Sequence, residues 1–317
     1  MWILNGAAVI KVLLALIVGG LGIYVALTHG VANPMEPKSF LPSLDVSSLS
    51  VVSVIIFNCL GFEVVCNFAK DMENPKKQIP QAIIAGGLAI AVVYIFTAFG
   101  IGTAIPTKEI SSSAGLVDSV QMLLSKITES PLTWFVTLVA ILFLLTLFGN
   151  MVSWSLGVNS VAQLAAKNND MPKVFAIESK KNGMPVGEAI MNGIVASVVV
   201  LLAPIIPNQD LFWCFFALNM VMFLLSYVPL FTAFLKLRKI DQTERVFRVP
   251  GGPVLTKLMA IIPMILVVVS LIFLAIPMDT SKETLEAVLP ITIGAVVFIA
   301  IGEIIAAIKG REESTAE

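Results

Sequence analysis

Apolar residues in this chain fall into long unbroken runs, separated by short polar stretches that contain most of the charges and prolines. Each run is about 20 residues long, which is the length that a helix needs to cross the roughly 30 Å hydrocarbon core of a bilayer. None shows the alternation of apolar and polar residues that marks the strands of a membrane barrel, so the pattern predicts helices. The eight predicted spans cover residues 6–28, 48–69, 81–104, 132–158, 187–206, 210–236, 254–277 and 286–308.

The composition agrees with a membrane setting and excludes several other classes of protein. Hydrophobic residues make up 57% of the 317 residues and charged residues 13%, against about 45–50% and about 25% in soluble domains. The net charge of -1 includes no basic block, so no nucleic-acid partner is expected. The three cysteines lie within apolar runs without metal-ligand spacing, and the single histidine follows the first span. We therefore expect an all-α integral membrane protein in a lipid bilayer, with no metal, no cofactor and no enzyme activity.

Lysine and arginine are distributed unevenly over the polar stretches. If the N-terminus is cytoplasmic, most of the 20 Lys and Arg residues lie in segments on the cytoplasmic side and few lie in the outer loops. Such a bias sets the orientation of membrane proteins, because positively charged loops stay inside. The pattern predicts a multi-pass protein of the cell membrane with both termini in the cytoplasm.

The second run contains polar and flexible residues near the middle of the bilayer. Gly61 weakens a helix by about 1 kcal/mol relative to alanine, and Glu63 would be costly if it faced lipid. A break at this depth is tolerated where it is buried in protein or lines a wet cavity, and its half-helix ends can bind the charged ends of a ligand. Two interpretations are open: an interrupted helix that faces a ligand, or a packing notch with a glutamate bonded to a neighbouring helix.

This run continues into the sequence "GFEVVCNFAKDMENPKKQIPQAI", residues 61–83. A G-x-E followed by an acidic residue, N-P-K/R and P-x-A-I resembles the signature after the sixth helix of amino acid permeases in the amino acid–polyamine–organocation (APC) superfamily. The whole chain is most similar to the glutamate/γ-aminobutyrate antiporter branch, and its eight spans match the family's fifth to twelfth helices. The resemblance implies a partial leucine-transporter-like fold that contains one complete five-helix repeat.

The resemblance also implies a set of substrate-site residues. In the family the sixth helix unwinds at the substrate and presents backbone groups to it. Phe57 matches an aromatic residue that closes over the substrate from the outside, and Glu63 matches a carboxylate associated with proton or pH coupling. The positions that match the unwound segment are Asn58, Cys59, Leu60 and Gly61.

A second match lies at the end of the fourth span, where "LAAKNNDMPKVFA" at 164–176 resembles the segment after the family's eighth helix. In this alignment Trp154 falls where relatives place an aromatic ring against the substrate side chain. Asn150 lies one turn earlier on the same face. Trp154 could instead belong to an interfacial aromatic belt. In the sixth span, Asn219 and Tyr227 either line the pathway or form hydrogen bonds between helices.

The expected organisation is a single transmembrane domain over residues 1–317. The last helix of the first repeat, the second inverted repeat, the two C-terminal helices and a cytoplasmic tail are expected at 1–28, 48–236, 254–308 and 309–317, respectively. Helices that match the family's first four are absent from this sequence. We therefore expect an N-terminally truncated reading frame or, as an alternative, a split transporter whose missing N-terminal helices come from another chain.

The function implied by the resemblance is that of an amino acid permease or antiporter, which works by alternating access and is linked to protons. Its substrate would be an amino acid such as glutamate or γ-aminobutyrate. The alternative is that the chain transports nothing by itself and is a fragment or partner subunit of a split transporter.

Overall fold

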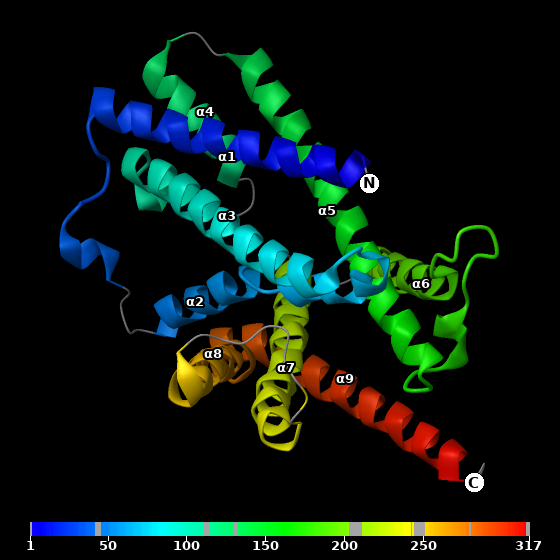
Figure 1. The fold of residues 1–317 in the computed structure, drawn as a ribbon. Helices are drawn as coiled ribbons and strands as arrows, with labels where there is room; N and C mark the ends of the chain where they lie inside the picture. The colour runs from blue at the N-terminus through cyan, green and yellow to red at the C-terminus, as the bar shows by residue number, and fades with distance from the viewer. Residues whose placement is uncertain are drawn as a thin grey trace. The chain divides into compact units, whose positions relative to one another are not determined.

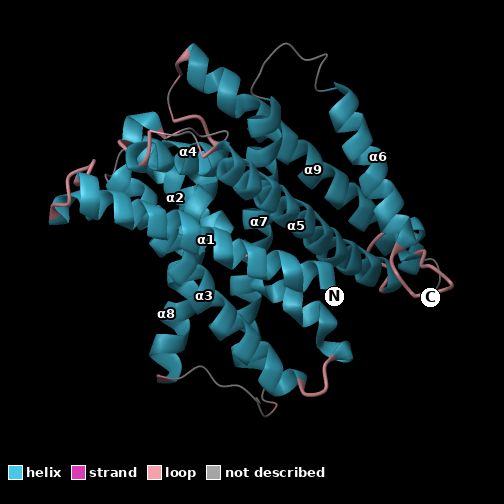
Figure 2. Cartoon of the chain, turned by 90° about the horizontal axis from the view of Figure 1, so that it is seen from above, coloured by secondary structure: helices cyan, strands magenta, loops and turns pink. Residues whose placement is uncertain are grey.

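The structure is a computed structural model that describes residues 2–41, 46–110, 115–129, 132–202, 211–241, 243, 251–278 and 280–314. Within these residues the elements are helices, as Figure 2 shows, which confirms the expected all-α class. The α-helices in Figure 1 are α1 (Trp2–His29), α2 (Val46–Asn58), α3 (Pro75–Ala104), α4 (Gly115–Ile127), α5 (Thr133–Lys167), α6 (Val186–Leu202), α7 (Leu211–Ile240), α8 (Gly252–Ala275) and α9 (Lys282–Ser314). The 3-10 helices are η1 (Pro37–Phe40), η2 (Phe62–Asp71), η3 (Thr107–Glu109) and η4 (Lys173–Ala176).

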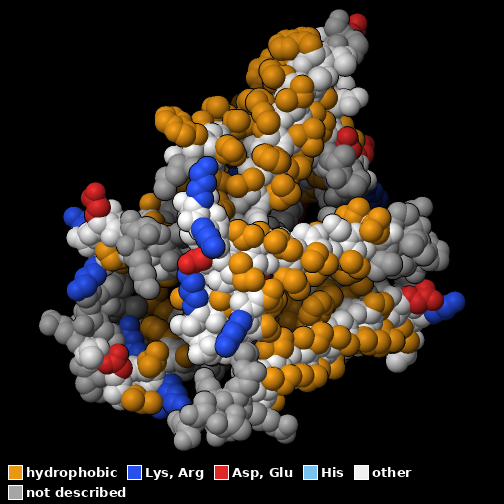
Figure 3. All heavy atoms as spheres, turned by 90° about the vertical axis from the view of Figure 1, so that its right-hand side faces the viewer, with side chains coloured by type: hydrophobic (Ala, Val, Ile, Leu, Met, Phe, Trp, Pro, Cys, Tyr) orange, Lys and Arg blue, Asp and Glu red, His pale blue; other side chains and the backbone are white. Residues whose placement is uncertain are grey.

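Six of the described helices are long and apolar enough to cross a membrane, namely α1, α3, α5, α7, α8 and α9. Many of their large apolar side chains lie on the surface, including Leu88, Val92 and Ile95 of α3. Figure 3 shows apolar side chains in orange along whole helices on one face of the molecule. A soluble protein rarely exposes contiguous apolar surface of this extent. The chain is therefore a multi-pass membrane protein.

Two of the eight predicted spans are shorter in the structure than expected. The span predicted at 48–69 is divided into α2, which has 13 residues, and the 3-10 helix η2. The span predicted at 187–206 is represented by the 17 residues of α6, and residues 203–210 lie outside the described part of the chain. The first difference results from the break at Gly61, which is analysed below.

Helix α3 begins earlier than the apolar pattern predicts. Pro75 takes the first helical position, where a missing N–H is not needed. The carbonyl of Asn74 accepts hydrogen bonds from the N–H groups of Lys77 and Gln78 at 3.2 and 2.9 Å. In return, the Asn74 N–H donates to Oε1 of Gln78 at 3.1 Å. This reciprocal capping satisfies donors at the start of the helix and fixes its first turn.

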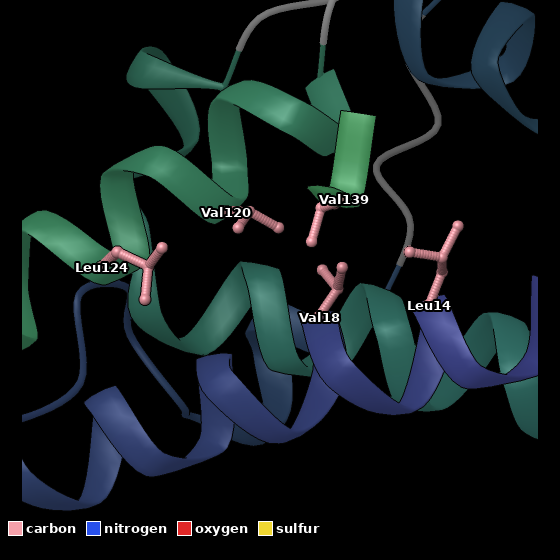
Figure 4. Packing of buried hydrophobic residues seen from close by; sticks show 5 residues of the cluster. All are labelled: Leu14, Val18, Val120, Leu124 and Val139. Carbon is pink, nitrogen blue, oxygen red and sulfur yellow. The ribbon is translucent and has the colours of Figure 1, made fainter. Parts of the chain in front are cut away.

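The chain forms two compact parts, which are described separately: residues 1–42 with 81–158, and residues 43–80 with 159–317. In the first part, α1 and α4 pack together around a core to which the start of α5 also contributes. Figure 4 shows this core, whose buried residues are Leu14, Val18, Val120, Leu124 and Val139. Helix α4 was not predicted, because its apolar residues are spaced for one buried face rather than joined in a continuous run.

Glycines bring α1 and α3 into backbone contact in the first part. A Cβ atom added to Gly22 would collide with the backbone of Gly100, and one added to Gly100 would collide with the backbone of Gly19. Small residues at a helix interface allow this close approach in membranes, where packing rather than water exclusion holds helices together. These three glycines therefore set the distance between α1 and α3.

The C-terminal end of α3 is closed by side chains from other segments of the first part. Nδ2 of Asn33 donates hydrogen bonds to the carbonyls of Gly102 and Ile105 at 2.6 and 2.7 Å. Nζ of Lys126 donates to the carbonyl of Ala104 at 2.7 Å. The last carbonyls of a helix have no partners within it, so these donors satisfy groups that would otherwise lack them.

In the second part, α7 packs against α8 and α9, and α2 packs against both α7 and α8. Leu224 and Tyr227 of α7 form a buried cluster with Val267 of α8. Ile56 and Leu60, on either side of the end of α2, pack against this cluster. The segment that contains the helix break is thereby held against α7 and α8.

Polar contacts in the second part connect α5 to the loop that precedes α6. Nζ of Lys167 lies 2.8 Å from Oε2 of Glu178, and Nε2 of Gln163 donates to the same oxygen at 3.1 Å. The hydrogen bond from Lys167 and its positive charge hold the pKa of Glu178 below its ordinary value. Further along, Nδ2 of Asn192 in α6 donates to Oδ1 of Asn159 in α5 at 2.7 Å.

The glycine contact between α1 and α3 leads to a first prediction. Replacing Gly22 with leucine should lower the melting temperature in detergent, because overpacking a close contact costs about 1–3 kcal/mol. Gly20 is a matched control on the same helix, since no atom lies within 4 Å of an added Cβ there. The melting temperature of each variant is measured by fluorescence-detected gel filtration after heating. Equal melting temperatures for Gly22→Leu and Gly20→Leu would contradict the role given to the contact.

Candidate functional site

The helix break predicted in the second run is present in the structure. Helix α2 ends at Asn58, and η2 begins at Phe62. Between them, Gly61 has φ 102° and ψ 1°, which is the left-handed region of backbone conformation. That region costs about 1–2 kcal/mol for residues with a Cβ. A glycine at this position therefore allows the chain to leave one helix and start the next.

Each of the three N–H groups in the break has an acceptor. The Cys59 and Leu60 N–H groups donate to the carbonyls of Ile56 and Phe57 at 3.0 and 3.1 Å, which tightens the last turn of α2. The third donor, the N–H of Gly61, has its acceptor on a different helix, and this contact is the most specific feature of the site.

The Gly61 N–H donates a hydrogen bond to the hydroxyl of Tyr227 in α7 at 2.8 Å. Tyr227 is only 6% exposed. An N–H without a partner inside a membrane protein is costly, so this hydroxyl stabilises the broken helix. The sequence left two roles open for Tyr227, and the structure identifies it as the partner of the break.

Phe57, the last aromatic residue before the break, is held by rings from α7. Its ring centroid lies 5.8 Å from that of Phe216 and 5.6 Å from that of Phe223, both in edge-to-face geometry. Phe223 in turn contacts the ring of Tyr227 at 5.4 Å. Such aromatic pairs are worth about 0.5–1.5 kcal/mol beyond the area that they bury. The aromatic face of α7 therefore fixes Phe57 and supports the hydroxyl that bonds Gly61.

The other predicted residues of this segment occupy different surroundings. Nδ2 of Asn58 donates to the carbonyl of Val54 at 2.8 Å, so the side chain folds back on its own helix. Cys59 has an exposed, unpaired thiol, and Leu60 is half-buried against the α7 and α8 cluster. Glu63 belongs to η2, but its side chain lies outside the described part of the structure. Its predicted role in proton or pH coupling stays a prediction.

Asn150 and Trp154 lie on α5 in the first part of the chain, whereas residues 57–61 belong to the second part. Trp154 is 39% exposed. Oδ1 of Asn150 accepts a hydrogen bond from Nζ of Lys11 in α1 at 3.3 Å. Sequence reasoning did not single out Lys11, although a lysine within an apolar span is itself a signal of function.

Among the residues that the structure describes, no group of three His, Cys, Asp or Glu side chains could hold a metal ion. The groups that the structure describes at the break are backbone dipoles, the aromatic ring of Phe57 and the Tyr227 hydroxyl. The C-terminal end of a helix carries partial negative charge on its last carbonyls, which suits a cation, and the start of the following helix suits an anion. A broken span of this kind is typical of substrate sites in secondary transporters.

Comparison with known proteins agrees with this geometry. The sequence pattern of the family described as "Amino acid permease" matches residues 1–301. The chain belongs to the amino acid permease family. The resemblance inferred from the G-F-E segment is thus confirmed. The names of the family and of its relatives are those of transporters rather than enzymes, as expected.

The relatives of this chain are named for different substrates. The probable agmatine/putrescine antiporter AguD of Lactococcus lactis is 60% identical over 305 residues, which are 96% of this chain and 65% of that protein. A glutamate/γ-aminobutyrate antiporter of the same species is 26% identical over 77% of this chain and 49% of its own length. The putrescine transporter PotE of Haemophilus influenzae is 24% identical over 49% of this chain and 34% of its own length. The chain thus matches less than two thirds of the length of each of these relatives.

A second prediction concerns the backbone of Gly61. Replacing Gly61 with alanine should destabilise the protein by about 1–2 kcal/mol, because the left-handed conformation disfavours a Cβ. Gly61→Asn should be less damaging, since asparagine visits this conformation more readily. Gly102→Ala in α3 is the control, because an added Cβ there meets no atom within 4 Å. Thermal melting in detergent ranks the stabilities of the three variants. A Gly61→Ala variant as stable as Gly102→Ala would contradict the left-handed conformation assigned to Gly61.

Proposed function

We propose that this chain forms the transport path of an antiporter that exchanges small amines, agmatine against putrescine, across the cell membrane. The observation that carries the proposal is the 60% identity to the Lactococcus lactis relative over 96% of this chain. The aligned residues cover nearly the whole of this chain. The identity to the glutamate/γ-aminobutyrate antiporter is only 26%. The amine antiporter is therefore the better guide to the class of substrate.

The chemistry of the break supports an amine as the ligand. Helix α2 ends there with the partial negative charge of its last carbonyls, to which an ammonium or guanidinium group is attracted. In the substrate site that we propose, residues 58–61 present backbone groups, and Phe57 closes the site from the outside. The resemblance also names Asn150 and Trp154 of α5 as substrate contacts, and we keep them as candidates in their own right, since an aromatic face attracts cations.

Proton coupling is assigned to Glu63, in keeping with the family resemblance. Transport would proceed by alternating access, in which the break lets the segments on either side of Gly61 tilt independently. We place both termini in the cytoplasm, which is the side that the bias of Lys and Arg favours.

Exchange of amino acids such as glutamate and γ-aminobutyrate is the second candidate, supported by the antiporter relative of that name. The two candidates differ in the charge of the substrate. An amine exchanger needs negative dipoles and aromatic faces, whereas a glutamate carrier needs donors for two carboxylates. Competition between the two classes of substrate therefore separates them.

Counterflow in proteoliposomes tests the proposed function. Vesicles loaded with putrescine should accumulate labelled agmatine above protein-free vesicles, and unlabelled putrescine but not glutamate should compete. The chain is reconstituted by itself and also together with the part of the Lactococcus relative that the alignment leaves uncovered. Accumulation in the second preparation alone would support completion of the site by further helices. Failure of both preparations to accumulate any amine would contradict the proposal, and competition by glutamate would favour the second candidate.

Substitution of Glu63 tests the coupling role. In the preparation that transports, Glu63→Gln should flatten the pH dependence of exchange between about pH 5 and 8, because the side chain can no longer bind or release a proton. Glu303→Gln in α9 is the matched control, since Glu303 is also a glutamate in a candidate membrane span and is exposed. A pH profile that Glu63→Gln leaves unchanged would exclude Glu63 as the coupling group.

A further inference from the structure

Helix α6 contains a buried carboxyl group in its first turn, that of Glu188. Glu188 is 8% exposed, and its Oε2 atom is buried without a hydrogen-bond partner. A polar atom that leaves water without gaining a hydrogen bond is destabilising, and an ionised carboxylate is far more so. The surroundings of Glu188 therefore favour the neutral, protonated form of the group.

The sequence explains why Glu188 lacks the partner that a glutamate at this position often has. Glu188 is the third residue of α6, where a glutamate can accept a hydrogen bond from the backbone N–H of the residue before the helix. That residue is Pro185, whose carbonyl accepts a helical bond from the Ala189 N–H at 3.3 Å. Proline has no N–H to donate in return. The usual capping bond is chemically impossible here, and the carboxyl group stays unpaired.

The charged side chains near this turn do not supply a counter-ion. Those between the end of α5 and the start of α6 are Lys167, Asp170, Lys173, Glu178, Lys180 and Lys181. Lys167 is already paired with Glu178 at 2.8 Å, and the other ion pair of the described residues joins Lys282 to Glu286. Neither pair involves Glu188, so a bound proton is what keeps this buried group neutral.

The 3-10 helix η4 packs directly against the first turn of α6. A Cβ atom added to Gly187 would collide with the carbonyl of Val174 in η4. The Gly187 N–H donates to the carbonyl of Ile177, just after η4, at 3.0 Å. Further along α6, Ile194 and Val198 are exposed. Burial in α6 is thus confined to the turn that η4 covers, and water gains access to Glu188 when η4 moves away.

We propose that Glu188 is a proton-operated latch between η4 and α6. With the proton bound, the carboxyl group is neutral and η4 stays packed on the first turn of α6. When the proton passes to water, the carboxylate has to be hydrated, and η4 separates from α6 to admit the water. The mobility of the segment that connects α5 to α6 therefore depends on pH. This inference does not depend on which substrate the chain transports.

The direction of the effect follows from the proton balance. The packed state holds one proton that the separated state has released, so a rise in pH favours separation. One proton changes the ratio of the two states by up to about tenfold for each pH unit. The packed state should therefore dominate at low pH and be lost progressively as the pH rises.

Hydrogen exchange, measured by mass spectrometry on the chain in lipid nanodiscs, tests the latch between about pH 5 and 8. Protection factors are compared, because they remove the intrinsic dependence of exchange on pH. The Gly187 amide is the reporter, and its protection should fall by up to about tenfold for each unit of rising pH. The amides of Ser179 and Gly183 are an internal reference that should not change. Both donate at 2.9 Å within the hairpin that precedes α6, to the carbonyls of Met184 and Ser179.

Two neutral variants separate the latch from a general effect of pH. Glu188→Gln resembles the protonated group in shape, so protection at Gly187 should stay high at every pH. Glu188→Met should give the same result without any hydrogen bond from an amide, and it decides the question if the glutamine variant misfolds. Glu303→Gln, at an exposed position of α9, should keep the pH dependence of the unsubstituted chain.

Three results would overturn the latch. The first is protection at Gly187 that stays constant over this pH range in the unsubstituted chain. The second is an equal fall with pH in the neutral variants of Glu188. The third is an equal fall at Ser179 and Gly183, because the whole connection would then be opening rather than the contact between η4 and α6.

Discussion

A backbone N–H or C=O inside a bilayer has no water to bond, and this constraint governs the most irregular part of the molecule. Where α2 stops at Asn58, the N–H groups that follow need acceptors. Two of them fold back on the carbonyls of Ile56 and Phe57, and the third reaches the hydroxyl of Tyr227. The break is tolerated because these donors are satisfied, and satisfying the last of them ties α2 to α7. The aromatic contacts around Phe57 follow from the same pairing of helices.

The need to satisfy every backbone group also explains the contacts at the C-terminal end of α3 in the first part of the chain. The last carbonyls of α3 lie beyond the reach of helical donors, and the side chains of Asn33 and Lys126 supply the missing bonds. Both donors come from segments distant in sequence, so each bond also closes a long loop. In both parts, the hydrogen bonds that satisfy backbone groups at a helix end therefore also hold distant segments of the chain together.

Local properties of the sequence were enough to predict the break but not its partner. Gly61 could be recognised because glycine weakens a helix and adopts a positive φ without strain. Tyr227 lies 166 residues further along, and no periodic pattern says which neighbouring helix will face the break. The contact between Lys11 and Asn150 was missed for the same reason, since 139 residues separate them. Helix α4 was missed because a search for continuous apolar runs passes over a half-buried helix.

The glycine contact and the capped end of α3 have a mechanical consequence. Gly22 and Gly100 hold α1 and α3 backbone to backbone, and Asn33 fastens the chain just after α1 to the C-terminal end of α3. Both attachments lie within the last turns of α3, so the C-terminal end of α3 is fixed to α1 and to the chain that follows α1. A change in the tilt of α1 would therefore have to carry this end of α3 with it.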